Sequence, residues 1–231
     1  MSPTQLRNTL NISKRHRYVY IDNPKAGSSS LKSALVALEL GVSVDSLHHR
    51  QFHSASQSPF ARLDDFVTAD PIRSLVSDGY FFFTMVRDPL TRLVSAYRSK
   101  IEKNTKHKAQ ILSRMGLDPA DLTQPVSFAD FVRVTAELSD LESDPHWRSQ
   151  TSQTLFERLP IDFTGRFEDF AEAYRTIFER IGGQTDELRS PPKRNASGEK
   201  QRQPEFFDEE LRATAVRRYE ADFVNFGYRR G

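Results

Sequence analysis

The stretch RYVYIDNPKAGSSSLKSALVAL, residues 17–38, decides the fold. Its first part, RYVYID, is dense in aromatic and β-branched residues and stops at Asn-Pro, which is typical of a buried strand. After a turn of small residues, apolar side chains recur from Leu31 to Leu38 at the i, i+3, i+4, i+7 spacing of one helix face, which ends near Gly41. The stretch therefore predicts a strand, a turn and a helix in direct succession.

The turn between this strand and this helix is suited to an anion. Backbone N–H groups at a helix N-terminus have no partner inside the helix, and the helix dipole favours negative charge there. No Gly-Lys-Ser/Thr sequence follows Gly27, however, as a P-loop kinase would require. The turn is thus expected to hold a phosphate-like anion other than ATP. The alternative is an ordinary strand–helix turn in which Lys25 is solvated.

A second strand–turn–helix unit is YFFFTMVRDPLTRLVSAYRSK, residues 80–100. YFFFTMV is apolar throughout, as expected for a central parallel strand. Asp88 is a favourable N-cap, and the proline after it is a favourable first helical residue. Thr91, Ser95 and Arg98 share a polar stripe beside the apolar helix face. Such a stripe at the carboxyl end of a parallel strand is well placed for a ligand.

The rest of the chain continues the alternation of strands and helices. SFADFVRVTAEL (127–138) opens with a capping-box-like pair, Ser127 and Asp130, and is expected to be a helix. IDFTGRFEDF (161–170) has the pattern of a strand that leads into a helix, and DEELRATAVRRYEADFVNF (208–226) that of one closing amphipathic helix. We expect residues 189–204 to form a loop and residues 1–16 an N-terminal extension. Strands alternating with helices predict an α/β fold with a parallel sheet, as a single domain over residues 1–231.

Composition excludes several classes of protein. The 231 residues carry a formal net charge of +2 and include no cysteine, which excludes disulfides, thiolate zinc sites and thiol nucleophiles. The first twenty residues lack the apolar region of a signal peptide, and no stretch approaches the roughly 20 apolar residues of a membrane span. We expect a soluble, cytoplasmic protein without a membrane span. The low net charge and the lack of a recognisable nucleic-acid motif argue against a nucleic-acid partner.

Together, the two strand–turn–helix units resemble the two nucleotide signatures of sulfotransferases, which use 3′-phosphoadenosine 5′-phosphosulfate (PAPS). The segment VRDP..RLVSAYR resembles the carbohydrate sulfotransferases of the Golgi type and their soluble bacterial relatives in particular. Three later segments resemble that family in the same order: DPHWRSQ (144–150), FTGRFEDF (163–170) and YEADFVNFGY (219–228). The resemblance implies a three-layer, P-loop-NTPase-like parallel β-sheet flanked by helices.

The resemblance also implies a donor site with PAPS as the cofactor. The 5′-phosphosulfate would bind the first turn, through Lys25, Ala26, Gly27, Ser28, Ser29 and Ser30, and Lys25 would neutralise charge as the sulfate leaves. Arg87 and Ser95 would bind the 3′-phosphate, which distinguishes this donor from ATP. Alternatively, Arg87 pairs with a carboxylate and Ser95 is a surface residue. Arg194 in the 189–204 loop would cover the nucleotide. Sulfate is poorly basic, so we predict no metal.

An acceptor hydroxyl must lose its proton as it attacks sulfur, and histidine suits a general base near neutral pH. His48, His49 and His53 lie between the two signatures, where the family often has its base, and His49 and His53 are the preferred candidates. The alternative for each is an ordinary surface or core histidine. No carboxylate joins these three at the spacing of a metal site. The other candidate pair is His146 and Trp147. The tryptophan could stack on a sugar or an adenine, or belong to the core.

The acceptor that the resemblance implies is a hydroxyl of a carbohydrate or glycoconjugate. A polyanionic product would favour a basic cleft, and five side chains could either line one or simply face water: Arg92, Lys100, Lys103, Lys106 and Lys108. Two other functions stay open. One is a P-loop kinase of small molecules, which the missing lysine opposes. The other is a non-catalytic binder of nucleotides or sulfated glycans. The sequence does not predict the oligomeric state.

Overall fold

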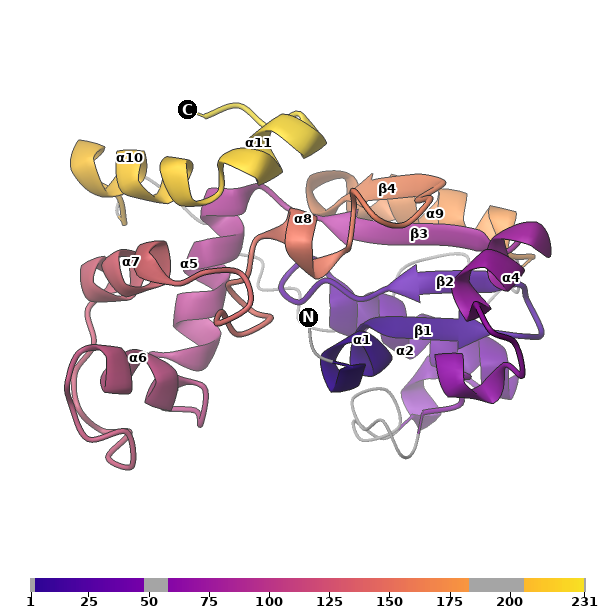
Figure 1. Ribbon diagram of the computed structural model, residues 1–231, viewed down its shortest axis with the longest axis horizontal. Helices are drawn as coiled ribbons and strands as arrows, with labels where there is room; N and C mark the ends of the chain where they lie inside the picture. Colours follow the sequence, from indigo (N-terminus) through magenta and orange to yellow (C-terminus); the bar gives the residue numbers. More distant parts are fainter. Residues whose placement is uncertain (1–2, 48–57, 183–205, 231) are drawn as a thin grey trace. The chain divides into compact units, whose positions relative to one another are not determined.

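The computed structural model describes residues 3–47, 58–182 and 206–230, which form two compact units (Figure 1). The first unit takes residues 1–86 and 154–198, and the second takes residues 87–153 and 199–231. The chain therefore leaves the first unit at the end of a strand and returns to it later. The single domain expected from the sequence stays a prediction.

The first unit is built on a four-stranded sheet in the order β1-β2-β3-β4. Its strands are β1 (Leu10–Ser13), β2 (Tyr18–Ile21), β3 (Phe81–Val86) and β4 (Phe163–Arg166). The strands β2, β3 and β4 run parallel, as the sequence predicts, and β1 pairs antiparallel with β2. The sequence analysis did not predict β1. The segment expected to be an N-terminal extension contains a short helix, α1 (Pro3–Thr9), and this edge strand.

Alternate residues of the sheet pack into two separate apolar clusters, which makes the unit three-layered. Tyr18, Tyr20 and Phe83 face α2 (Ser28–Leu40) and α9 (Phe170–Arg180). The opposite face carries Val19, Ile21 and Phe82 and packs against Leu75 of α4 (Pro71–Ser77), with Leu6 of α1 at its margin. Figure 1 shows these helices on the two sides of the sheet. The α/β fold with a flanked, mostly parallel sheet is thus confirmed. Three short 3₁₀ helices complete the described part of the unit: Val44–Ser46, Leu63–Asp65 and Phe167–Asp169.

The described part of the second unit is helical. Its helices are α5 (Pro89–Lys100), α6 (Lys108–Arg114), α7 (Phe128–Glu137), α8 (Gln150–Gln153), α10 (Glu209–Arg218) and α11 (Glu220–Phe226). They share one apolar cluster that includes Leu93, Phe131, Trp147 and Phe223. The two predicted helix starts are confirmed. Thr91 N donates to the side chain of Asp88, at 2.9 Å, and Ser127 forms a capping box at the start of α7.

The single helix predicted over residues 208–226 is wrong, because the chain forms two helices there. The break is at Tyr219, whose backbone angles (φ −109°, ψ 23°) leave the helical region. The buried Tyr219 hydroxyl donates to the carbonyl O of Trp147, at 2.7 Å. This is a tertiary contact, and the apolar periodicity of the helices does not reveal it.

Gly165 of β4 tests the packing of the first unit. A Cβ at this position would lie 2.5 Å from Met85 Sδ and 2.7 Å from the Cβ of Ala173 on α9. The methionine can rotate away, but the alanine cannot, so α9 must move. We expect Gly165→Ala to lower the free energy of unfolding by about 1–3 kcal/mol in urea titrations. Thr176→Ala, at an exposed site on the same helix, is the control and should change it by less than about 0.5 kcal/mol. Equal stability of Gly165→Ala and the unmodified protein would contradict this packing.

Candidate functional site

In the first unit, the predicted anion-binding turn connects β2 to α2. Asn23 fixes it to the neighbouring strand, because its Nδ2 donates to the carbonyl O of Met85, at 2.9 Å. Gly27 is the N-cap of α2, and its φ of +81° lies in the left-handed region that favours glycine. A Cβ there would lie 2.5 Å from a ring carbon of Phe170, so both conformation and space require glycine. Gly27 makes no side-chain cap bond, and the first backbone N–H groups of α2 lie at this turn because a helix directs them toward its N-terminus.

A buried ion pair supports this turn. The Nζ of Lys32 lies 3.0 Å from Asp22 Oδ2, and the Ser28 hydroxyl donates to the other carboxylate oxygen. Burial opposes the ionisation of Asp22, yet Lys32 and Ser28 hold the pKa of this carboxyl below its usual value. The charge of Lys32 is therefore neutralised by Asp22 within the protein. Lys25 is half-buried in the turn itself and, like Gly27, has a positive φ, of 73°. The sequence analysis missed the pair of Asp22 and Lys32.

In the second unit, Arg87 precedes α5 and is held at two places. Its backbone N–H donates to Gln150 Oε1, at 2.9 Å, and its carbonyl O accepts from Gln150 Nε2, at 2.7 Å. Its side-chain Nε lies 3.3 Å from the Thr91 hydroxyl. Ser95 follows one helical turn beyond Thr91 and is partly exposed, so the predicted polar stripe is present on α5. The guanidinium of Arg98 lies over the Phe206 ring, 4.9 Å from its centre.

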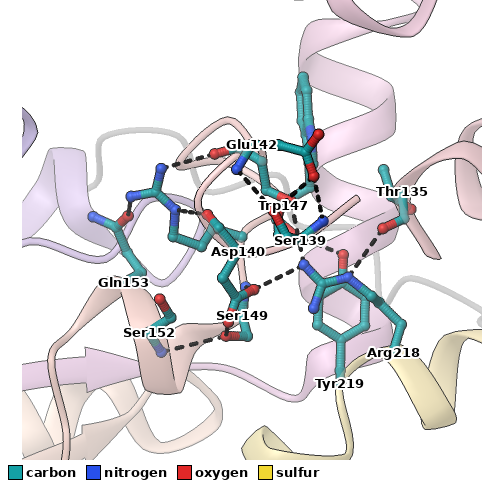
Figure 2. A network of polar contacts seen from close by, with 12 residues as sticks. Thr135, Ser139, Asp140, Glu142, Trp147, Ser149, Ser152, Gln153, Arg218 and Tyr219 are labelled. Carbon is teal, nitrogen blue, oxygen red and sulfur yellow. Dashed lines mark hydrogen bonds and ion pairs between the residues drawn. The ribbon is translucent and has the colours of Figure 1, made fainter. Parts of the chain in front are cut away.

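A network of polar contacts orders the segment between α7 and α8 (Figure 2). Asp140 lies at its centre and accepts from Arg218 Nη2 at 2.8 Å and from the Ser149 hydroxyl at 2.6 Å. The backbone carbonyl of Asp140 accepts from the buried Arg148 guanidinium, at 2.7 Å. Burial opposes the ionisation of Asp140, yet the bonds from Ser149 and Arg218 hold the pKa of this carboxyl below its usual range.

Several side chains that were candidates for ligand contact are structural. Trp147 is fully buried and meets the Phe131 ring edge-on at 5.5 Å, so the core alternative holds. Arg92 is also buried, and its guanidinium donates to the carbonyls of Arg148 and Pro145, at 2.8 and 3.0 Å. Lys108 is buried as well and bonds Asn104 Oδ1 and the carbonyl of Leu122. Arg92 and Lys108 therefore do not line a basic cleft. Lys103 and Lys106 are exposed, and Lys100 is partly exposed.

His146 belongs to a histidine–carboxylate cluster. Its Nδ1 lies 2.6 Å from Asp144 Oδ1, and the Nδ1 of His107 lies 2.9 Å from Asp144 Oδ2. Burial opposes the ionisation of Asp144, yet the two histidines hold the pKa of this carboxyl well below its usual value, so both Nδ1 atoms donate. Burial lowers the pKa of His146, Asp144 partly offsets this by raising it, and Lys100 and His107 lower it further. The imidazole of His146 is thus neutral near pH 7, with its lone pair on Nε2.

Two imidazoles and a carboxylate are also a donor set that divalent metals accept, and one ligand atom from each of His107, Asp144 and His146 lies within 4.8 Å of the others. Asp144, however, already accepts three N–H donors, because the backbone N–H of His146 adds to the two Nδ1 groups. A metal held through these atoms would have to displace the protons of both histidines. The arrangement therefore fits a hydrogen-bonded cluster best.

The remaining predicted site residues are not described by the structure. His48, His49 and His53 fall within residues 48–57, and Arg194 falls within residues 183–205. The first unit also has a cavity of about 390 Å³, whose lining includes Arg17, Phe81 and Asp162. It lies at the amino ends of β2 and β3, at the opposite end of the strands from the turn at residues 22–27.

The chain is similar to known proteins along nearly its whole length. The profile of the sulfotransferase family matches residues 8–229. The chain belongs to the sulfotransferase family. It is similar to human carbohydrate sulfotransferase 14, with 29% identity over 195 residues, which cover 82% of this chain and 48% of that protein. It is also similar to mouse carbohydrate sulfotransferase 12, with 25% identity over 98% of this chain and 61% of the relative.

Carbohydrate sulfotransferase 10 of Xenopus laevis is 28% identical over 131 residues, which cover 53% of this chain and 36% of the relative. The chain therefore spans between about a third and three fifths of the length of the curated relatives named here. No solved structure matches it at a significant level. Among the residues that the structure describes, no helix is both long and apolar enough to cross a bilayer.

The Asp140 network predicts a specific pH dependence for the stability of this protein. The folded pKa of Asp140 is depressed, so its contribution to stability is present above the unfolded pKa, about 3.9, and is lost as the pH falls through the lower folded pKa. We expect Asp140→Asn to lower the free energy of unfolding by about 2 kcal/mol at pH 7 and by clearly less at pH 3. Trp147 is the single tryptophan, so its fluorescence in urea reports on this unit.

The control for this experiment is Glu137→Gln, which changes an exposed carboxylate on α7. Its effect should stay within about 0.5 kcal/mol at both pH values. A loss for Asp140→Asn that is equal at pH 7 and pH 3 would show that the ionised carboxylate is not what stabilises the segment.

Proposed function

We propose that this chain transfers a sulfuryl group from PAPS to a hydroxyl of a carbohydrate or glycoconjugate. The observation that carries the proposal is the pair of strand–turn–helix elements, one at residues 22–30 and one at Arg87, within a chain that matches the sulfotransferase family over residues 8–229. The names of its relatives, carbohydrate sulfotransferases 10, 12 and 14, support a carbohydrate acceptor.

The 5′-phosphosulfate would bind at the start of α2. The turn offers backbone N–H groups from Gly27 to Ser30 and the positive end of the helix dipole. The hydroxyl of Ser28 already donates to Asp22, so the contribution of Ser28 is its backbone N–H. Ala26 and Ser29 complete the turn. Lys25 would neutralise the charge that develops on the leaving phosphate, and such electrostatic stabilisation is usually the largest part of catalysis.

The 3′-phosphate would bind Arg87 and Ser95 on the stripe of α5. A guanidinium offers two parallel, charge-assisted N–H bonds to phosphate oxygens, which a hydroxyl can complement. ADP lacks this phosphate, so these two residues would set the preference for the PAPS family of nucleotides over ADP. Arg194 stays a proposed third contact.

The transfer itself would be an in-line displacement at sulfur. The acceptor oxygen forms a bond to sulfur as the bond from sulfur to the bridging phosphate oxygen breaks, and the hydroxyl proton passes to a general base. The product nucleotide is 3′-phosphoadenosine 5′-phosphate (PAP). His49 and His53 are the proposed bases. His146 is a third candidate, because its neutral form, with Nδ1–H held by Asp144, leaves Nε2 free to accept a proton. No metal is required by this step, and a cytoplasmic location stays a prediction.

Two alternatives make different predictions about ligands. A P-loop kinase of small molecules would bind Mg²⁺-ATP at the turn. A non-catalytic binder would hold nucleotides or sulfated glycans without turnover. Lys25→Ala would then cause no loss of turnover. The following experiments distinguish these readings.

Donor binding is tested by calorimetric titration with PAP and with ADP, without added metal. We expect PAP to bind much more tightly than ADP. Arg87→Ala should weaken PAP by about 30-fold or more, because it removes charge-assisted bonds of about 2–3 kcal/mol, and should leave ADP unchanged. Arg133→Ala, which removes an exposed arginine of α7 away from this stripe, is the control and should keep the preference for PAP. Equal binding of PAP and ADP to the unmodified protein would refute the sulfotransferase proposal.

Lys25→Ala should lower turnover of labelled PAPS by about 10²–10³-fold.

The base is tested by the pH dependence of kcat/KM in His49→Ala, His53→Ala and His146→Ala. A base must be deprotonated, so activity falls as the pH drops through its pKa. If His49 or His53 is the base with an ordinary pKa, activity should decline below about pH 6.5. If His146 is the base, its lowered pKa should shift the decline in activity to a lower pH than an ordinary histidine would give. A variant that keeps full activity and an unchanged profile excludes its histidine as the base.

A further inference from the structure

Gln150 makes an unusual contact with Arg87, because its side-chain amide bonds both backbone groups of one residue. Gln150 Oε1 accepts from Arg87 N at 2.9 Å, and Gln150 Nε2 donates to Arg87 O at 2.7 Å. Gln150 is fully buried. The two bonds also fix the orientation of the amide. A flipped amide would place its NH₂ group against the N–H of Arg87 and its oxygen against the carbonyl O of Arg87.

Arg87 needs such a partner because of its place in the chain. It lies between β3, which ends at Val86, and α5, which begins at Pro89. Its backbone therefore belongs neither to the sheet nor to the helix, and the glutamine replaces the hydrogen bonds that regular structure would supply. At the other end of the side chain, Nε contacts the Thr91 hydroxyl at 3.3 Å. The arginine is thus held at its backbone and along its side chain.

Gln150 is itself fixed by a buried carboxylate. Asp222 Oδ2 accepts from Gln150 N, and Asp222 Oδ1 accepts from Thr151 N, both at 2.8 Å. The Thr151 hydroxyl adds a third bond to Oδ1, at 2.9 Å. Asp222 is fully buried and comes from α11, so a side chain 72 residues away holds the first turn of α8. On the other side, Arg92 binds the carbonyls of Pro145 and Arg148, just before Gln150.

We infer that Gln150, anchored by Asp222, is a positioning residue that sets the direction of the Arg87 guanidinium and thereby the preference for a 3′-phosphorylated nucleotide. The inference rests on the proposed function. A two-pronged contact between guanidinium and phosphate depends on angle as well as distance, and a long side chain satisfies it best when its base is already fixed. Gln150 needs no contact with the ligand to have this effect.

The test compares PAP and ADP by calorimetry in Gln150→Ala and Gln150→Glu. Glutamate keeps the size of the side chain and can accept from Arg87 N, but it places an oxygen against Arg87 O. We expect each variant to weaken the affinity for PAP by about tenfold, which is the size of effect that a lost supporting hydrogen bond has on a binding group. The affinity for ADP should stay the same. Gln153→Ala is the matched control. This buried glutamine of the same helix bonds the guanidinium of Arg148, so its loss should affect stability but not the ratio of the two affinities.

A double-mutant cycle separates positioning from general damage. If Gln150 acts through Arg87, Gln150→Ala should cause no further loss of PAP affinity in the Arg87→Ala background. Equal weakening of PAP and ADP by Gln150→Ala, or an additive loss in the double variant, would overturn the inference and leave the proposed function intact. Equal binding of PAP and ADP to the unmodified protein would refute the proposed function, and with it this inference. Gln150→Glu keeps the test open if Gln150→Ala does not fold.

Discussion

Backbone polar groups that leave the end of a buried strand must find partners without water, and this requirement shapes both candidate ligand positions. At the end of β2 the chain turns through Asn23. Its side-chain amide donates to the carbonyl O of Met85, the second-last residue of β3. One residue beyond β3, Gln150 satisfies Arg87 in the same manner, with both halves of its amide. At each position a buried amide holds an irregular backbone in one conformation. A ligand can then meet groups that are already in place.

Charges inside the protein extend this principle from single residues to whole segments. Asp22 with Lys32 supports the turn of the first unit, and Asp140 with Arg218 supports the segment before α8 in the second. Asp140 is partly buried and the other three charges are more deeply buried, and each has partners because an isolated charge in an apolar interior would be very costly. The segment from 139 to 149 has no helix or strand of its own. Its order therefore depends on these directional bonds and on the insertion of Trp147 into the core.

Local patterns in the sequence were enough for the elements that carry the fold. Apolar runs, the Asp88 cap and the Ser127 box predict β2, α2, β3, α5 and α7 because each signal acts within a few residues. The edge strand β1 has only four residues, too few for a clear period. Asp222 and Arg92 lie within amphipathic helix patterns, where a charged residue normally faces water. Their true partners lie 72 and 56 residues away, and a single sequence holds no signal for such pairs.

The same distinction applies to the two ends of the proposed donor. Recognition of the 5′ end would rest mainly on backbone N–H groups and a helix N-terminus, which tolerate side-chain change as long as Gly27 keeps its conformation. Recognition of the 3′ end would rest on one arginine whose placement depends on Gln150, and on Asp222 behind it. On this proposal, substitutions at Gln150 or Asp222 would change selectivity for the nucleotide without altering the groups that act at sulfur. Selectivity in this protein would then be a property of its buried hydrogen bonds as much as of the residues that meet the phosphate.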